Sequence, residues 1–231
     1  MATHRPRNGT ISAAPPDPVT RVADSSLDGR AAETEGALRP TLHGVCALSV
    51  LIEGTTSLLM HRYDVAAIEH RASAPKGSAQ RRTDDPEEYL YRTPEGRLSI
   101  PATNVKRAFV ETGRYFDDPR SSGRRRQATD LFRASLLVEP ESPLLLVGGR
   151  PVDAPEFLDR RRAVVQRQAV ARTRPGLMAG WRLAFRVVSL DARYVAPALL
   201  REALDCAGRY IGLGDFRPDF GRVQVVSAVE D

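Results

Sequence analysis

WRLAFRVVSL, at Trp181–Leu190, alternates apolar and basic residues with the two-residue period of a half-buried strand. One face of this strand would carry four apolar side chains and the other face two arginines: Trp181, Leu183, Phe185 and Val187 against Arg182 and Arg186. Such a strand packs one face on a core and leaves the other accessible. The stretch therefore predicts one strand of an antiparallel sheet that is covered on one side.

A helix and a last strand are predicted after this strand. Pro197 suits a first helical position, and an apolar stripe follows at helical spacing over Leu200, Ala203, Leu204, Ala207 and Ile211. Gly212 stands where a helix-ending glycine belongs. A glycine-rich loop then leads to a strand at Gly221–Val229, with Val223 and Val225 on one face and Val229 further along. The end of the chain thus reads strand–helix–strand.

The front of the chain repeats this order with insertions. Val45–Glu53 reads as a central strand, and Arg97–Ile100 as a short one. Pro101 precedes a helix whose buried face we expect to be Val105, Ala108, Phe109, Thr112 and Phe116. SLLVEP and PLLLVGG predict two short strands, and RAVVQRQAVARTRP predicts one more. Two such units predict an α+β, ferredoxin-like (RRM-like, split βαβ) fold with helices on one face of the sheet.

The chain divides into a tail and one domain. Residues 1–42 are rich in Pro, Ala and Ser without a period, which predicts a disordered N-terminal tail. Residues 43–231 would form the folded domain, with insertions at about 64–96 and 117–175. No apolar run has the length of a membrane span and no signal peptide is visible, so we expect a cytoplasmic protein without a membrane partner. Cys46 and Cys206 fall in apolar segments and are expected to be buried free thiols.

Arginine dominates the positive charge of the chain. The net charge is +5, and residues 120–174 contain twelve arginines against six acidic residues. An arginine-rich proteome could produce this excess, but such a density also favours phosphate partners. The candidate nucleic-acid contacts in this segment are Arg160, Arg161, Arg162, Arg167, Arg172 and Arg174.

Two other segments offer phosphate or backbone contacts. Asn104, Lys106 and Arg107 would lie near the start of a helix, where the dipole favours anions. Gly212, Gly214 and Gly221 would let backbone approach a ligand, with Arg217 and Arg222 as phosphate clamps. This loop follows a helix C-terminus, which argues against a phosphate cradle, and it could equally be a packed turn closed by Phe216 and Phe220.

Catalytic and metal sites have weaker support. His61, beside Arg62 and Tyr63, could act as a general acid or base in a nuclease, although lone histidines are more often solvated. Asp84 and Asp85 could hold Mg²⁺, but acidic residues before a proline more often begin a helix. Metal-ligand spacings, nucleotide loops and nucleophile elbows are absent, so we expect neither a metal nor a cofactor.

Two stretches resemble the CRISPR RAMP superfamily. RLSIPATNVKRAFVETGR is similar to the segment of that family that enters the first helix, on Ile100, Pro101, Thr103, Lys106 and Ala108. It departs at Asn104, where the family usually has Ser or Leu, and at Arg107, where Gly is common. IGLGDFRPDFGRVQV resembles the family's glycine-rich loop between its last helix and last strand.

The resemblance implies a backbone subunit of a CRISPR-type ribonucleoprotein in antiviral defence. Such a subunit binds single-stranded RNA, or an RNA–DNA hybrid, without catalysis and largely without sequence preference, beside copies of itself and other effector subunits. The chain is also similar to uncharacterised phage and prophage proteins. The alternatives are a RAMP-type endoribonuclease using His61, a phage single-strand DNA-binding or annealing protein, and a phage assembly protein.

Overall fold

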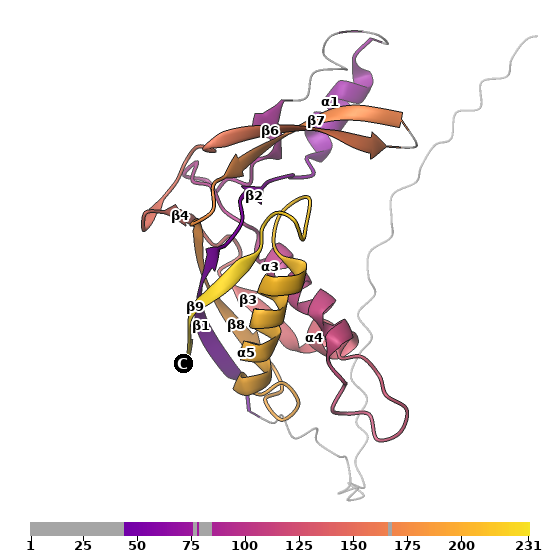
Figure 1. Cartoon of the computed structure of the whole chain (residues 1–231), viewed down its shortest axis with the longest axis vertical. Helices are drawn as coiled ribbons and strands as arrows, with labels where there is room; N and C mark the ends of the chain where they lie inside the picture. The colour runs from indigo at the N-terminus through magenta and orange to yellow at the C-terminus, as the bar shows by residue number, and fades with distance from the viewer. Residues whose placement is uncertain (1–43, 76–77, 79–84, 166–167) are drawn as a thin grey trace, which may run out of the picture. The chain divides into compact units, whose positions relative to one another are not determined.

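The computed structural model describes residues 44–75, 78, 85–165 and 168–231. The expected tail at residues 1–42 and part of the expected insertion at 64–96 lie outside the described residues. The described part mixes helices with antiparallel sheets, so the α+β class is confirmed. Figure 1 shows the helices at Ala102–Thr112 (α3), Thr129–Ser135 (α4) and Pro197–Cys206 (α5) on one side of the larger sheet.

The larger sheet contains six strands in the order β5-β4-β8-β1-β9, with β3 also paired to β8. Its pairings are antiparallel throughout. The strands are β1 (Cys46–Gly54), β3 (Leu136–Glu139), β4 (Leu145–Val147), β5 (Arg150–Pro151), β8 (Arg182–Ser189) and β9 (Val223–Glu230). The two strands predicted to flank the last helix, β8 and β9, therefore lie on either side of β1.

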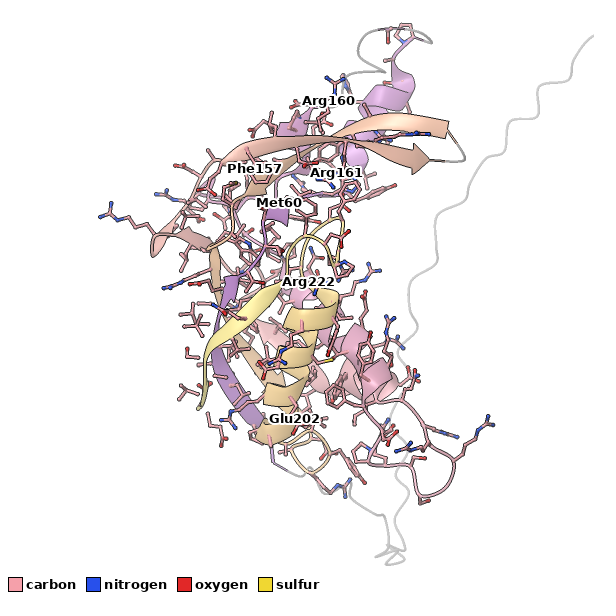
Figure 2. The ribbon with its side chains drawn as sticks, in the orientation of Figure 1. Met60, Phe157, Arg160, Arg161, Glu202 and Arg222 are labelled. Atoms are coloured by element: carbon pink, nitrogen blue, oxygen red, sulfur yellow. The ribbon has the colours of Figure 1, made fainter. Side chains whose placement is uncertain are left out.

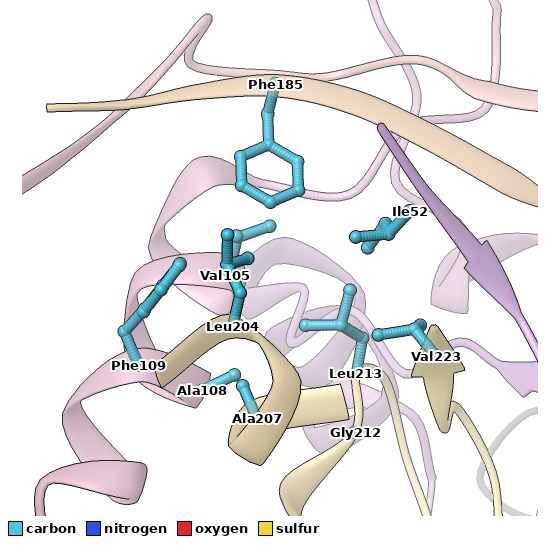
Figure 3. Close-up of a pocket in the computed structure, with 10 residues that line it drawn as sticks. All are labelled: Ile52, Val105, Ala108, Phe109, Phe185, Leu204, Ala207, Gly212, Leu213 and Val223. Carbon is cyan, nitrogen blue, oxygen red and sulfur yellow. The ribbon is translucent and has the colours of Figure 1, made fainter. Parts of the chain in front are cut away.

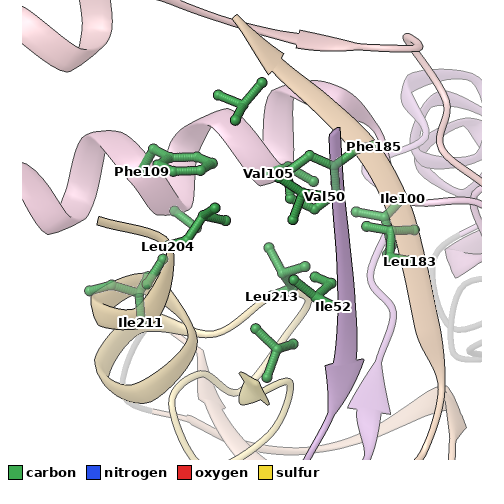
Figure 4. Packing of buried hydrophobic residues seen from close by; sticks show 14 of the residues in the cluster. Val50, Ile52, Ile100, Val105, Phe109, Leu183, Phe185, Leu204, Ile211 and Leu213 are labelled. Carbon is green, nitrogen blue, oxygen red and sulfur yellow. The ribbon is translucent and has the colours of Figure 1, made fainter. Parts of the chain in front are cut away.

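One face of this sheet is covered by helices. They are α3 (Ala102–Thr112), which continues into η2 (Gly113–Tyr115), then α4 (Thr129–Ser135) and α5 (Pro197–Cys206), which continues into the π-helix η3 (Ala207–Ile211). Val50 and Ile52 of β1 point toward them and pack with Phe185, Val105 and Leu204, as Figure 4 shows. Burial of these side chains is the main favourable term in folding. The predicted inward faces of β8 and α3 are confirmed, and Pro197 stands in the first turn of α5.

The core leaves little internal space. A crevice between α3, α5 and the sheet has a volume of about 20 Å³ and is lined mainly by apolar side chains (Figure 3). That space holds about one water molecule and suits no organic ligand.

A smaller second sheet corrects one prediction. Its order is β2-β7-β6, formed by β2 (Leu58–Leu59), β6 (Phe157–Val165) and β7 (Gln168–Leu177). RAVVQRQAVARTRP was predicted as one strand, but the chain reverses between Val165 and Gln168 and forms a hairpin. No glycine, proline or asparagine marks this turn in the sequence, so only the pairing of the two strands reveals it.

Two details of the larger sheet and its helices were not predicted. The helix α4 lies within the expected insertion at 117–175 and buries Leu131 and Phe132. On β9, Val223 and Val225 pack against the core, whereas the side chain of Val229 is 62% exposed. The β1–β9 register shifts between Leu51 and Ile52, and such a bulge turns the following side chains to the other face.

The remaining short helices lie in the segment between β2 and α3. They are α1 (Val65–Ser73) and η1 (Pro86–Tyr89). Asp85 caps η1 by accepting a hydrogen bond from the backbone N–H of Glu87 at 3.0 Å. This contact matches the helix-start interpretation of the acidic cluster, whose other member, Asp84, lies outside the described residues.

Candidate nucleic-acid interface

A polar pocket of about 150 Å³ lies between the first turns of α3, the glycine-rich loop and the segment after β2. Its lining residues are His61, Tyr91, Asn104, Arg107, Gly214, Asp215 and Arg217. Five of them, His61, Asn104, Arg107, Gly214 and Arg217, were candidates from the sequence. They come from three separate segments of the sequence, and the fold brings them into one pocket.

The side chains on the α3 side of the pocket carry a net positive charge. One carboxylate, that of Glu111, accepts from Arg107 Nε at 2.9 Å and from Arg217 Nη2 at 3.3 Å. Arg217 Nη1 also donates to the carbonyl of Gly212 at 3.3 Å. Two guanidinium groups thus share one acid near the C-terminal end of α3. Asn104 adds the first turn of the same helix to the pocket, and a helix N-terminus favours anions. Because one carboxylate neutralises only one of the two guanidinium groups, a phosphate oxygen in the pocket would meet hydrogen-bond donors with one positive charge left over.

Asp215 anchors the other side of the pocket. Its Oδ2 accepts a hydrogen bond from Arg174 Nε at 2.7 Å and lies 3.5 Å from His61 Nδ1. The ring of His61 also makes an edge contact with Tyr89, with centroids 5.0 Å apart. The imidazole is therefore held in place by a carboxylate and an aromatic ring. Asp215 and Tyr91 were missed from the sequence because their types and spacing match no motif.

The arginines of the β6–β7 hairpin divide between its two faces. Arg174 is 4% exposed, and its guanidinium stacks on Tyr89 at 4.6 Å from the ring centroid. Arg161 lies over Phe220 at 4.5 Å and over Phe216 at 5.0 Å. Figure 2 labels Arg161 and its neighbour Arg160 on β6. Because Arg161 donates to Asp159, it holds the pKa of that carboxyl below its usual range. Arg161 and Arg174 therefore attach the hairpin to the rest of the domain.

The opposite face of the hairpin is accessible. Arg160 and Arg162 are exposed, and within the described residues neither forms an ion pair or hydrogen bond through its guanidinium. Arg172 is half-buried and pairs across the hairpin with Arg161, on the inner face. Arg167 lies outside the described residues. The candidate arginines thus divide into those that contact the rest of the domain and those that are exposed, as the alternation of side chains in a strand requires.

The glycine-rich loop is a packed turn. Gly214 and Gly221 have φ of 79° and 72°, and a Cβ on either would overlap a backbone carbonyl, that of Leu59 or of Leu213. The amides of Leu213, Asp215 and Gly221 donate to carbonyls within the protein. The glycines accommodate the protein's own backbone, so the predicted approach of bare backbone to a ligand has no support here. Only Gly214 lines the pocket.

Two predicted contacts lie away from the pocket. Arg222 donates to the carbonyls of Pro218 at 2.8 Å and Arg209 at 2.9 Å, and so ties the loop to the end of η3. Lys106 is half-buried on α3 and does not line the pocket. Arg222 thus has structural contacts within the protein, and its assignment as a phosphate clamp stays a prediction.

The uncovered face of the larger sheet carries neutralised charges. Arg182 pairs with Glu53 at 2.6 Å, and Arg186 pairs with Glu139 at 3.1 Å and with Asp231. A shallow groove of about 590 Å³ on this face is lined by side chains that include Ser49, Leu51, Ala184, Ser227 and Val229. RNA-recognition domains instead stack bases on aromatic rings of this face. No exposed ring lies on these strands in the described part of the chain.

The two cysteine thiols are poorly suited to nucleophilic chemistry. Cys46 and Cys206 are free but only half-buried, and burial raises the pKa of both thiols, which makes them weak nucleophiles.

Among the described residues, no group of three or more His, Cys, Asp or Glu is placed to hold a metal ion. None of the helices in that part of the chain is long and apolar enough to cross a membrane.

Comparisons with known proteins find similarity only at the level of structure. No protein-family model and no curated protein matches the chain. A chain in the cryo-EM structure of the type III-B Cmr-beta bound to cognate target RNA is 10% identical, with a TM-score of 0.45 over 80% of this chain and 60% of that chain. The present chain thus spans less than two thirds of the length of that neighbour.

A chain of a type IV-B CRISPR complex is 17% identical, with a TM-score of 0.40 over 80% of this chain and 90% of that chain. The solved structures to which the chain is similar thus include chains of CRISPR complexes of types III-B and IV-B.

Proposed function

We propose that this protein binds single-stranded RNA, or the RNA of an RNA–DNA hybrid, through its phosphates and largely without regard to sequence. The observation that carries the proposal is the convergence of Asn104, Arg107 and Arg217 on one polar pocket. Guanidinium groups and a helix N-terminus recognise phosphate, which every nucleotide presents. The exposed Arg160 and Arg162 add a second contact on the hairpin.

We further propose that the domain, residues 43–231 after a disordered tail, is ferredoxin-like with insertions at about 64–96 and 117–175. The chain order β1, α3, β3, β8, α5, β9 and the sheet order β3-β8-β1-β9 support this assignment, because they match a split βαβ arrangement. The bound strand would then lie at the loops and the start of α3 rather than on the uncovered sheet face, whose arginines are already neutralised.

The role that we favour for this binding is that of a non-catalytic backbone subunit in a CRISPR-type ribonucleoprotein, beside copies of itself and other effector subunits. Binding through phosphates suits such a role, because a subunit that repeats along a strand meets a different sequence at each position. The CRISPR RAMP resemblance of the two sequence stretches supports the same role. Wild-type protein should therefore bind RNA strands of different sequence with similar affinity.

The double variant Arg107→Gln, Arg217→Gln tests the pocket. We expect its affinity for single-stranded RNA to fall about a hundredfold, because each charge-assisted contact contributes about 1.5–3 kcal/mol. The slope of log affinity against log salt should decrease in magnitude by about 1.4, since each lost phosphate contact on a single strand contributes about 0.7. Fluorescence anisotropy titrations with labelled RNA over a range of salt concentrations measure both quantities.

The matched control is Arg97→Gln, Arg201→Gln, which removes the same charge from two ion-paired arginines outside the pocket. This control variant should change the affinity for RNA by less than a factor of about three, since it alters only the overall electrostatic field of the protein. Equal losses in the two double variants would contradict the assignment to the pocket. A DNA strand of the same sequence, run in parallel, tests the single-strand DNA-binding alternative. If the wild-type protein binds neither the RNA nor the DNA strand, the phage assembly protein is the alternative that remains.

A second candidate function is RNA cleavage at His61. The observation that favours it is the 3.5 Å approach of His61 Nδ1 to Asp215 in the pocket that also holds Arg107 and Arg217. His61 could take the proton of a 2′-hydroxyl while that oxygen bonds to phosphorus and the 5′-oxygen leaves with a proton from water. The two arginines would then stabilise the charge on the phosphoryl oxygens.

Cleavage of single-stranded RNA in the presence of a chelator tests this candidate. The expected products carry a 2′,3′-cyclic phosphate, and His61→Ala should reduce the rate by about a hundredfold or more, as loss of a general base does. RNA binding by this variant should persist, because the arginines remain. Absence of cleavage by wild type, or cleavage that survives His61→Ala, would exclude the nuclease function.

A further inference from the structure

Two tyrosines form an exposed aromatic pair at the end of α3. Tyr115, in η2, and Tyr210, in η3, have ring centroids 5.7 Å apart and an interplanar angle of 47°. Their side chains are 55% and 60% exposed. Core packing does not require rings with this exposure. The pair bridges two parts of the chain that lie far apart in the sequence, because α3, which continues into η2, packs against η3.

Arginines flank this aromatic pair. The guanidinium of Arg114 lies 5.9 Å from the centroid of the Tyr115 ring and donates to the carbonyl of Glu111 at 2.9 Å. Arg209 precedes Tyr210 and is exposed, and within the described residues its guanidinium has no ion pair. Phosphates of a strand crossing the two rings would therefore meet cations on either side.

The pair lies on the same helical face as the α3 side of the phosphate pocket. Arg107, which lines the pocket, Glu111, which accepts from Arg107, and Tyr115 follow one another at four-residue spacing along α3 and η2. The stretch from Arg107 to Tyr115 spans about 12 Å at about 1.5 Å per residue, roughly three or four steps at the ~3.4 Å spacing of stacked bases. A strand whose phosphate occupies the pocket would place a base a few nucleotides further along within reach of the tyrosine rings.

We propose that Tyr115 and Tyr210 form a stacking platform for nucleobases of the single strand whose phosphate binds in the pocket. This inference rests on the proposed function. Any base can stack on an aromatic ring, so the platform adds affinity without adding sequence preference. The ligand is a run of unpaired nucleotides, because bases in a duplex are already stacked on their neighbours and do not reach a side chain.

The test compares Tyr115→Leu, Tyr210→Leu with wild type on two labelled strands. One strand is a uridine homopolymer, and the other is the same backbone with abasic sites in its central part. The double variant should bind the intact strand about tenfold more weakly, because stacking is worth about 1–3 kcal/mol per base. Its affinity for the abasic strand and its salt slope should equal those of wild type, since the phosphate contacts remain.

The control variant is Tyr63→Leu, which removes another exposed tyrosine ring, 74% exposed, and should affect neither strand. Equal weakening on both strands, or no weakening on the intact strand, would overturn the platform. A variant that binds RNA normally but loses self-association would assign the rings to a protein contact, which also overturns it. Wild type that binds neither strand would refute the proposed function and the platform with it. Thermal melts verify that each variant is folded.

Discussion

Alanine in place of Gly221 is expected to destabilise the domain by about 4 kcal/mol or more, a loss that few single substitutions reach. Two effects add. Gly221 has φ of 72°, where an L-residue costs about 1–2 kcal/mol, and its Cβ would overlap the carbonyl oxygen of Leu213. Leu213 is a buried residue of the same loop, and its amide donates to the carbonyl of Gly221 at 2.8 Å, so its carbonyl has little freedom to move. Urea unfolding of wild type and variant measures the difference.

Gly96→Ala provides the control for this prediction. Gly96 has a similar φ of 82°, but a Cβ there meets nothing within 4 Å. Its cost should be the conformational part alone, about 1–2 kcal/mol. If the two alanine variants lose the same stability, the loop is not tightly packed at Gly221, and the description of a closed turn fails.

Methionine in place of Arg174 should cost about 3 kcal/mol and loosen the hairpin. Arg174 is 4% exposed, and its removal leaves the half-buried carboxylate of Asp215 without its 2.7 Å donor. The stacking of the guanidinium on Tyr89 is lost as well. We expect a lower urea midpoint and faster proteolysis between Phe157 and Leu177, since Arg174 and Arg161 attach this segment to the domain.

The second variant in this test is Arg174→Met combined with Asp215→Asn. It removes the uncompensated carboxylate and should recover part of the lost stability, because the pair is then neutral on both sides. A surface variant, Arg133→Gln, breaks an ion pair whose side chains are 62% and 82% exposed and should cost less than about 0.5 kcal/mol. No recovery in the combined variant would indicate that packing of the arginine stem, rather than its charge, explains the loss.

Local patterns predicted the elements of the fold well where one face of an element is buried. The alternation at Trp181–Leu190 and the stripes of the helices that became α3 and α5 were correct because burial imposes the period of each element. The hairpin was not predicted, since its inner face contains arginines that satisfy their charges on Asp159 and Asp215. Residues of this kind have no apolar period to detect.

The candidate site was predicted residue by residue but not as an arrangement. Residue type was sufficient to select His61, Asn104, Arg107 and Arg217, because these side chains suit phosphate or proton transfer. It could not separate Arg160, which is exposed, from Arg161, which lies over two phenylalanine rings. The two residues are neighbours in sequence and differ only in the face of the strand on which they lie.

The amino-acid sequence alone determined the fold class, the order of those strands and helices that bury one apolar face, and the excess of arginine, since these depend on local periodicity and composition. The tertiary structure alone decided which arginines are available to a ligand. It gathered side chains from residues 61, 104, 107 and 217 into one pocket and placed Tyr115 beside Tyr210. Contacts between segments this distant in sequence arise from packing, and packing leaves no local period in the sequence from which they could be predicted.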